Sequence, residues 1–310
     1  MKAVDLETIR RTLDFAELID AMRGALIAQS RGECDTPMPM HLAVPPERAE
    51  IHIKSSYRLG GKYFAMKVAS TFPGNRERGR STSSGMMLLL SAETGDPLAY
   101  FADNGEMTDL RTAAVAAMTT RELGRTDKTL GVIGAGIQGR LQARMHAEVL
   151  PVEEIVVHDA VPERATQYVS DMKTLLPKVK VTVCGLAAEV ASRAKLIVTV
   201  TPSRTPHFGA DAVRPGTHIN AVGADTAGKN ELDPGVLRRA ALVLVDSRAQ
   251  CRRLGELQHA PDVAERAVEI GAWIASPTPI DADAVTVADF TGLGVEDLFI
   301  AQYVYEHLES

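Results

Sequence analysis

A glycine-rich loop is the strongest chemical signal in the sequence. It lies in the segment GVIGAGIQGR, where Gly134, Gly136 and Gly139 have the spacing G-x-G-x-x-G between a β-branched run and a helical stretch. In a dinucleotide-binding loop the first glycine permits a tight turn, the second lets the backbone approach a pyrophosphate, and the third allows close helix–strand packing. The phosphates then lie on free amides at the helix amino terminus. The alternative is a tight strand–helix turn that binds no ligand.

Asp159 ends the next predicted strand, 20 residues after Gly139. This is the spacing expected for an acid that accepts hydrogen bonds from the adenosine ribose hydroxyls. A carboxylate there repels a 2′-phosphate, so we predict NAD as cofactor. Arg164 lies close by in sequence and keeps NADP possible. The alternative for Asp159 is a solvated loop acid.

Other strand ends carry polar residues that could act beside a nicotinamide. The run LIVTVTP ends with Thr201 and Pro202, and THINAVGAD ends with Asp225. Ligands of open α/β sheets lie beyond the carboxyl ends of the strands. An acid at such a position is placed for general acid–base work. The alternative is that Asp225 caps the following turn.

Lys67 lies within FAMKVAS, where its neighbours are apolar or small. Alternation puts its side chain on the face opposite Met66 and Val68, beside Ala65 and Ala69. A partly desolvated lysine has a lowered pKa and can shuttle protons. The alternative is a lysine exposed at a sheet edge.

Arg111 lies at the start of an alanine-rich helix predicted from GEMTDLRTAAVAA. A positive charge there opposes the helix macrodipole. A substrate carboxylate over the helix amino terminus would neutralise the guanidinium and bind it in a bidentate manner. The alternative is pairing with Glu106 or Asp109.

The elements that position these residues follow two patterns. Apolar spacing predicts a helix over residues 14–30, with Phe15, Leu18, Ile19, Met22 and Leu26 on one face. The segments EIHIKSSY, YFAMKVAS, GMMLLLSAE and LAYFAD then predict antiparallel strands joined by glycine turns.

From Lys128 onward the pattern changes to short β-branched runs separated by helical stretches: TLGVIGAG, EEIVVHD, VKVTVCG, KLIVTVTP, THINAVGAD and ALVLVD. Such runs are typical of a parallel sheet covered on both faces. AVTVADF predicts one more strand, and GVEDLFIAQYVYEHL predicts a final helix.

Composition limits the class of protein. The chain has 310 residues, 45% of them hydrophobic and 24% charged, with a net charge of −6. The length suggests two domains, and the charge argues against a nucleic-acid or membrane partner. No apolar run approaches the roughly 20 residues of a membrane span. The charged amino terminus and the widely spaced Cys34, Cys184 and Cys251 favour a cytoplasmic protein without disulfides.

No spacing typical of a metal site occurs among the eight histidines, and we expect no bound metal. His259 in ELQHA is interpreted as a structural residue.

A set of segments, in order from about Lys67 to Ala301, resembles the ornithine cyclodeaminase/mu-crystallin family. These segments are KVASTFPGN, GEMTDLRTAAVAA, GVIGAGIQGR, TVTPSRTP, NAVGADTAGKNELDP and TGLGVEDL. The resemblance implies an α/β protein with a Rossmann dinucleotide-binding domain over residues 119–289. It also implies an α+β substrate-binding and dimerisation domain over residues 1–118 and 290–310, with homodimers formed through the sheets of these domains.

By the same resemblance, Lys67 and Arg111 hold the substrate carboxylate, Lys67 shares a proton with the amine, and Asp225 is the catalytic aspartate. The further cofactor-binding residues expected are Ile137, Gln138, Thr201, Pro202, Val222, Thr82, Ser83, Gly292 and Leu293. Many family members carry another arginine upstream of the first strands. The matching stretch TPMPMHLAV has none, and His41, His52 or Lys54 are candidates to replace it.

These features predict hydride transfer between NAD and the α-carbon of a small L-amino acid or the corresponding imine. An imine intermediate leads either to release of a keto acid, as in a dehydrogenase, or to cyclisation with loss of ammonia, as in an ornithine cyclodeaminase. The missing arginine favours redox chemistry. A non-catalytic ligand-binding protein of the mu-crystallin type is the remaining alternative.

Overall fold

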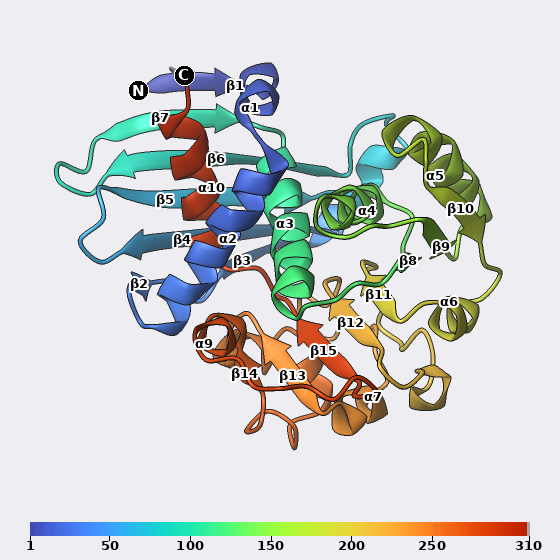
Figure 1. Cartoon of the computed structure of the whole chain (residues 1–310). Coiled ribbons are helices and arrows are strands. Elements are labelled where there is room, and N and C mark those ends of the chain that lie inside the picture. The colour runs from blue at the N-terminus through green and yellow to red at the C-terminus, as the bar shows by residue number, and fades with distance from the viewer. Residues whose placement is uncertain (309–310) are drawn as a thin grey trace. The chain divides into compact units, whose positions relative to one another are not determined.

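The computed structural model describes residues 1–308 and divides the chain into two compact units (Figure 1). Unit 1 consists of Met1–Thr112 and Leu293–Ser310, and unit 2 consists of Ala113–Gly292. Unit 1 holds the antiparallel strands predicted in the first third of the chain, and unit 2 holds the predicted parallel sheet. The predicted fold class is confirmed.

Unit 1 is built on a seven-stranded sheet with the order β1-β7-β6-β5-β4-β2, and β3 also pairs with β4. Strands β4 to β7 are antiparallel neighbours, as predicted. Strand β1 was not predicted, and it pairs with β7 in parallel. The strands are β1 (Lys2–Asp5), β2 (Cys34–Asp35), β3 (Met40–Val44), β4 (Ala49–Arg58), β5 (Tyr63–Thr71), β6 (Ser83–Ser91) and β7 (Pro97–Ala102).

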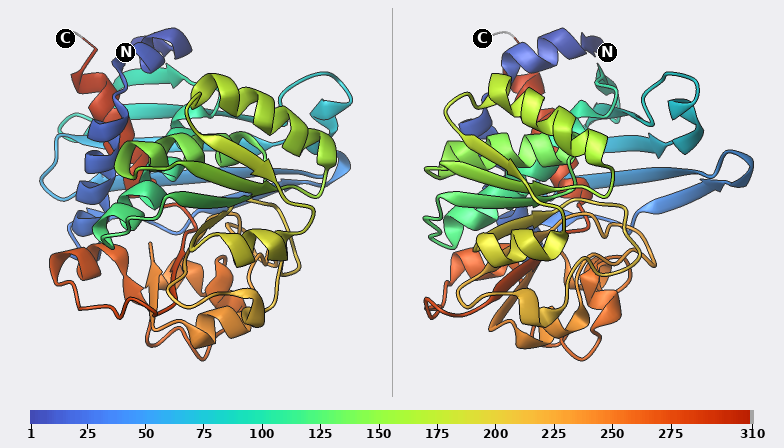
Figure 2. Two further views of the ribbon diagram at one scale, coloured as in Figure 1. Left: turned by 45° about the vertical axis from the view of Figure 1, so that its right-hand side comes forward. Right: turned by 90° about the vertical axis from the view of Figure 1, so that its right-hand side faces the viewer.

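One face of this sheet is covered by helices α2 (Phe15–Ser30) and α10 (Gly294–Glu306) (Figure 1). The predicted apolar positions of α2 are buried at Leu18, Ile19, Met22 and Leu26, whereas Phe15 is only half-buried. Unit 1 also contains α1 (Leu6–Thr12) and the beginning of α3 (Glu106–Glu122). In Figure 2 (right) the hairpin of β3 and β4 projects beyond the other strands of this sheet.

Unit 2 is built on an eight-stranded parallel sheet with the order β10-β9-β8-β11-β12-β15-β13-β14. The strand order reverses between β8 and β11, and this is the switch point at which doubly wound sheets bind ligands. The strands are β8 (Thr129–Ile133), β9 (Glu154–His158), β10 (Lys180–Val183), β11 (Leu196–Thr199), β12 (His218–Ala221), β13 (Leu242–Val245), β14 (Val268–Glu269) and β15 (Thr286–Asp289).

The helices of unit 2 alternate with most of these strands, which is how a parallel sheet buries both faces. They are the part of α3 from Ala113 onward, α4 (Ile137–Val149), α5 (Pro162–Leu175), α6 (Ala187–Arg193), α7 (Pro234–Arg239), α8 (Arg248–Cys251), α9 (Ile270–Ala275) and the 3-10 helices η3 (Ala210–Ala212) and η4 (Glu256–His259). Among the described residues 1–308, no helix is long and apolar enough to cross a membrane.

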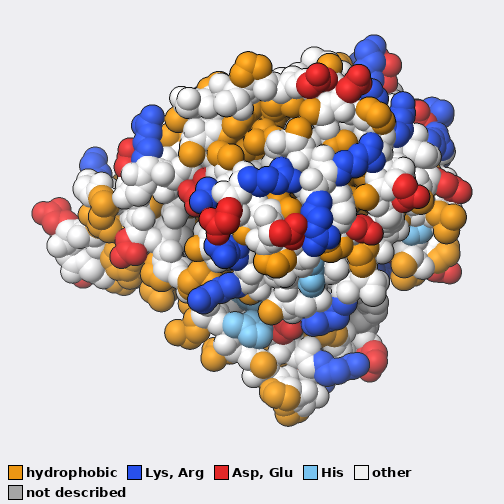
Figure 3. All heavy atoms as spheres, turned by 90° about the horizontal axis from the view of Figure 1, so that it is seen from below, with side chains coloured by type: hydrophobic (Ala, Val, Ile, Leu, Met, Phe, Trp, Pro, Cys, Tyr) orange, Lys and Arg blue, Asp and Glu red, His pale blue; other side chains and the backbone are white. Residues whose placement is uncertain are grey.

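The three cysteines form no disulfide, and one face of the molecule carries charges of both signs. Cys34, Cys184 and Cys251 are all free thiols. On the face drawn in Figure 3, basic, acidic and hydrophobic side chains are interspersed.

Candidate active site

The glycine loop of unit 2 connects β8 to α4 with a backbone that only glycine can follow at two points. Gly134 has φ +109°, and a Cβ on it would lie 2.8 Å from the Val200 carbonyl oxygen. A Cβ on Gly139 would lie 2.1 Å from the Gly134 carbonyl oxygen. Gly136 caps α4, and it is exposed together with Ile137. The amino end of α4 is therefore accessible to an anionic ligand such as a pyrophosphate.

Asp159 follows β9 and holds this loop in place. Its carboxylate accepts hydrogen bonds from the backbone amides of Ala135 at 2.8 Å and Val161 at 2.9 Å. Each carboxylate oxygen has a further lone pair with which it can accept a ribose hydroxyl. Asp159 is thus a structural acid of the loop rather than a solvated one, and this position suits the predicted contact with a ribose.

Arg140, in the first turn of α4, also fixes the loop and was not predicted. Its Nη1 donates to the carbonyl oxygens of Ala135 and Gly136 at 2.8 and 2.9 Å, and its Nε donates to Asp171 at 2.6 Å.

Glu231 joins the ends of β11 and β12, and no motif in the sequence predicted this role. Its fully buried carboxylate accepts hydrogen bonds from Thr199 Oγ1 (2.7 Å), Thr201 N (2.7 Å), Thr201 Oγ1 (2.8 Å) and Gly223 N (2.8 Å). Two of the predicted cofactor-binding residues are next to these contacts, Pro202 exposed and Val222 buried. The loops at the switch point are therefore tied together by one carboxylate.

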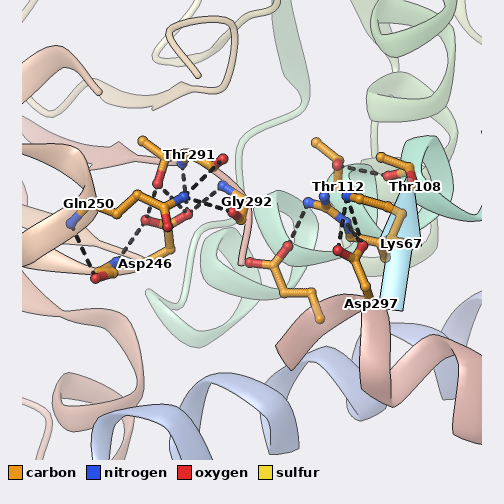
Figure 4. A network of polar contacts seen from close by, with 11 residues as sticks. Lys67, Thr108, Thr112, Asp246, Gln250, Thr291, Gly292 and Asp297 are labelled. Atoms are coloured by element: carbon orange, nitrogen blue, oxygen red, sulfur yellow. Dashed lines mark hydrogen bonds and ion pairs between the residues drawn. The ribbon is translucent and has the colours of Figure 1, made fainter. Parts of the chain in front are cut away.

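Asp246, after the end of β13, fixes the loop that follows β15. Its carboxylate accepts from the amides of Thr291 and Gly292, each at 2.7 Å (Figure 4). Gln250 Nε2 donates to the Gly292 carbonyl oxygen at 2.9 Å. Gly292 has φ +72°, the left-handed conformation that favours glycine. The next residue, Leu293, belongs to unit 1 and caps α10.

Asp225 follows β12 and is about half exposed, at 48%. Its Oδ1 accepts a hydrogen bond from Thr226 Oγ1 at 3.1 Å and forms an ion pair with Lys229. His259, interpreted as structural, makes a 2.8 Å contact between its Nε2 and the Lys229 carbonyl oxygen.

Lys67, Arg111, Glu296 and Asp297 form a buried charged cluster in unit 1. Lys67 Nζ lies 2.9 Å from Asp297 Oδ2 (Figure 4), and Arg111 Nε lies 2.9 Å from Asp297 Oδ1. Arg111 Nη1 lies 2.6 Å from Glu296 Oε2. The four side chains are only 1–3% exposed.

Burial sets the electrostatics of this cluster. Burial, opposed by Asp297 and assisted by the charges of Arg111 and Lys54, lowers the pKa of Lys67 to about 7. Burial alone would raise the pKa of Asp297, but Arg111 and Lys67 outweigh it and the pKa is lowered. Asp297 is therefore an anion, whereas Lys67 can gain or lose a proton near neutral pH.

The structure bears on two alternatives raised by the sequence. Lys67 is not at a sheet edge, because β5 lies between β4 and β6. Of the two acids suggested as partners of Arg111, Glu106 binds Arg10, whereas Arg111 forms ion pairs with Glu296 and Asp297. Helix α3 begins at Glu106, so Arg111 lies in its second turn. The dipole effect decays within the first turn, and α10 supplies Glu296 and Asp297 as counter-ions of Arg111.

The other residues predicted in unit 1 lie on strands β3, β4 and β6 or directly before them. Lys54 lies directly opposite Lys67 on the neighbouring strand β4. His41 of β3 lies opposite His52 of β4, and the rings of the two histidines are in contact. Ser83 begins β6, and the carbonyl oxygen of Thr82 accepts a hydrogen bond from Phe72 N at 2.7 Å.

These two arrangements define a class of protein: a Rossmann-type nucleotide-binding unit with a built glycine loop, joined in one chain to a sheet unit that holds a buried lysine–arginine cluster. The sequence model of the ornithine cyclodeaminase/mu-crystallin family matches residues 2–310. The chain belongs to this family, as its motifs predicted.

Individual relatives agree with this assignment. The chain is 38% identical over 299 residues to a putative dehydrogenase of Rhizobium meliloti, covering 93% of this chain and 90% of the relative. The structure of Thermococcus litoralis Δ1-pyrroline-2-carboxylate reductase with NADH and L-proline superposes with a TM-score of 0.92 at 26% identity, covering 99% and 97% of the two chains. An archaeal alanine dehydrogenase dimer with bound NAD superposes with a TM-score of 0.89 at 29% identity, covering 98% and 95%.

Proposed function

We propose that this protein is an NAD(P)-dependent oxidoreductase that transfers hydride between a nicotinamide and the α-carbon of a small L-amino acid or the corresponding imine. The observation that carries the proposal is the glycine loop of unit 2, whose close backbone contacts and exposed helix terminus suit a dinucleotide. Family membership and the oxidoreductase relatives support the choice of reaction.

The residues of the loop fit NAD, with NADP as the second candidate. Gly134, Gly136 and Gly139 with the amino end of α4 would hold the pyrophosphate, and Asp159 would accept the ribose hydroxyls. Ile137, Gln138, Thr201, Pro202, Val222, Thr82, Ser83, Gly292 and Leu293 remain the proposed contacts along the rest of the cofactor. When bound, the nicotinamide accepts or donates the hydride.

Lys67 and Arg111 are the proposed anchors of the substrate carboxylate. Both already have acidic partners, so the substrate carboxylate must compete with Asp297 and Glu296 for them. The contacts with α10 hold both side chains in place before the substrate arrives, and orientation of this kind lowers the barrier to reaction. Lys54 adds positive charge next to Lys67 and is a further candidate, together with His41.

Proton transfer falls to Lys67 and Asp225. Above a pH of about 7 a neutral Lys67 can accept a proton from the substrate amine, so that the nitrogen lone pair assists loss of hydride from the α-carbon. Asp225 is the proposed base for the water that attacks the imine. Addition of that water and loss of ammonia then release the keto acid. In the reductive direction Lys67 returns its proton to nitrogen.

A panel of amino acids and imino acids tests the reaction. Each L-amino acid is incubated with NAD while NADH and ammonia are both measured, and cyclic imines or keto acids with amines are incubated with NADH. We expect NADH formation or consumption with one chemical class. Ammonia without net NADH would indicate a cyclodeaminase, and no turnover with any member would favour a ligand-binding protein.

Asp225→Asn tests the assignment of the acid–base residue. This variant should lose turnover while it still binds NAD, with Asp262→Asn, an exposed acid elsewhere, as matched control. Full activity of Asp225→Asn would show that another group handles the proton.

The exposed face of the unit 1 sheet suits the proposed homodimer. Strand alternation puts apolar residues on the face opposite Lys67, and three of them are strongly exposed: Met40 (57%), Leu42 (46%) and Met66 (40%). Contiguous exposed apolar surface is typical of a subunit interface. Sedimentation analysis should give the mass of a dimer, and Met66→Lys should shift the protein toward monomers. A monomeric wild-type protein would contradict this proposal.

A further inference from the structure

The β3–β4 hairpin brings together three potential metal ligands whose sequence spacing matches no metal-binding motif. His41 and His52 are directly opposite each other across the two strands, and Glu50 lies two residues before His52 on β4. Residues two apart on a strand point to the same side, as do opposite residues of neighbouring strands. All three side chains therefore lie on one face of the hairpin.

The distances agree with this placement. The ring centroids of His41 and His52 are 4.9 Å apart, and His52 Nε2 lies 3.8 Å from Glu50 Oε2. One ligand atom from each of the three side chains can be chosen so that all lie within 4.8 Å of one another. His41 is exposed, and the other two side chains are half-buried.

We propose that His41, Glu50 and His52 form a binding site for a divalent transition metal, with Zn²⁺ as the first candidate. Two imidazole nitrogens and one carboxylate oxygen are a ligand set that Zn²⁺ accepts, with bonds of about 2.0–2.2 Å and a fourth position open to water. Imidazole also suits Ni²⁺ and Co²⁺, whereas Mg²⁺ and Ca²⁺ prefer oxygen ligands alone. The ligand atoms must approach one another to bind, and the exposed His41 side chain has room to rotate.

The surroundings contain charges of both signs. Lys54 is two residues beyond His52 on the same face, and its positive charge weighs against a cation. The Glu50 carboxylate opposes this effect from inside the site. The apolar residues Met40, Leu42 and Ile51 point to the other face of the hairpin, so a dimer formed through that face would leave the metal site accessible.

Sequence spacing alone did not predict this site, because its ligands come from two strands whose register decides which residues meet. The inference does not depend on the proposed enzymatic function. Metal binding is measured without cofactor or amino acid, so a failure of one proposal is distinguishable from a failure of the other.

The test is a calorimetric titration of the whole protein, prepared without a polyhistidine tag, with Zn²⁺. We expect saturable binding of one ion per chain, and His41→Ala, His52→Ala and Glu50→Gln should each weaken it by about tenfold or more, an effect as large as loss of supporting groups at known sites. The matched control is His307→Ala, which changes an exposed histidine at the carboxyl end of α10. This variant should bind Zn²⁺ as the wild type does.

A second readout uses Co²⁺, whose visible absorption reports its ligands. We expect an absorption band that is lost in His41→Ala and His52→Ala, while circular dichroism shows that both variants are folded. Absence of binding, or binding that these variants leave unchanged, would overturn the proposal and leave the histidine pair as a ring contact of the hairpin.

Discussion

Replacing Asp297 by Asn tests how the charged cluster of unit 1 is held together. The side chain pairs with Lys67 and Arg111, each at 2.9 Å, and all three groups are 2–3% exposed. Below about pH 7, where Lys67 is charged, removal of one partner of a buried ion pair costs about 3–5 kcal/mol, because it leaves an uncompensated charge. Arg111 retains Glu296 as a partner in this variant, so Lys67 bears most of the loss.

The cost should depend on pH. In the wild-type protein Asp297 opposes the effect of burial on the pKa of Lys67, which is about 7. Without Asp297 that pKa falls further below its unfolded value. Below pH 7 the wild type binds a proton that the variant does not, so the free-energy difference grows as pH falls, by at most about 1.4 kcal/mol per pH unit.

Urea unfolding followed by circular dichroism at about pH 6 and pH 8 measures both effects. The matched control is Asp262→Asn, which breaks an ion pair with Arg238 whose side chains are 52% and 55% exposed. Exposed pairs contribute little to stability, so the control should unfold close to the wild type at both pH values. If Asp297→Asn unfolds like the control, the described cluster does not stabilise unit 1.

Three other predictions concern unit 2. Glu231→Gln replaces one acceptor oxygen with a donor in a site where every described partner is a donor. We therefore expect this variant to bind NAD at least tenfold more weakly and to have a lower melting temperature. Unchanged affinity would mean that the loops keep their positions without this carboxylate. Asp159→Asn removes a charged acceptor, and a charge-assisted hydrogen bond contributes about 1.5–3 kcal/mol. The Kd for NAD, measured by fluorescence titration, should therefore rise roughly 10–100-fold. An unchanged Kd would exclude the ribose contact. Burial, together with the negative charges of Asp289 and Glu231, raises the pKa of Glu256 from 4.5 to about 9. Between these two pH values the folded state binds more protons than the unfolded state. The free energy of unfolding should therefore fall as pH rises through this range. Glu256→Gln should therefore lose less melting temperature between pH 6 and pH 9 than either the wild type or Glu265→Gln, an exposed control; equal slopes would show that Glu256 is ionised throughout.

Much of the fold could be predicted because local patterns and tertiary structure agree. The alternating segments became β4 to β7, and the β-branched runs after Lys128 became the parallel sheet of unit 2. Strand β1 was missed, because a short charged segment such as KAVD has no pattern of its own and acquires its structure by pairing with β7.

The candidate site was predictable only where its residues are close in sequence. The glycine loop and Asp159 follow a fixed spacing, which the loop geometry explains. The partners of Arg111 come from α10, 185 and 186 residues further along the chain, and no local pattern indicates them. Glu231 similarly receives its donors from two other strand ends. Asp246 was detectable, because it is an acid at the end of a predicted strand, the same signal that singled out Asp159 and Asp225.

The central claim is that hydride passes between the nicotinamide and the α-carbon of an amino or imino acid. The most direct test uses NADH that carries deuterium at the transferred position of C4, together with the imino acid that proves active, and determines the label in the amino acid product by mass spectrometry and NMR. We predict one deuterium per product molecule, located at the α-carbon. Product without deuterium at that carbon would exclude hydride transfer to the α-carbon.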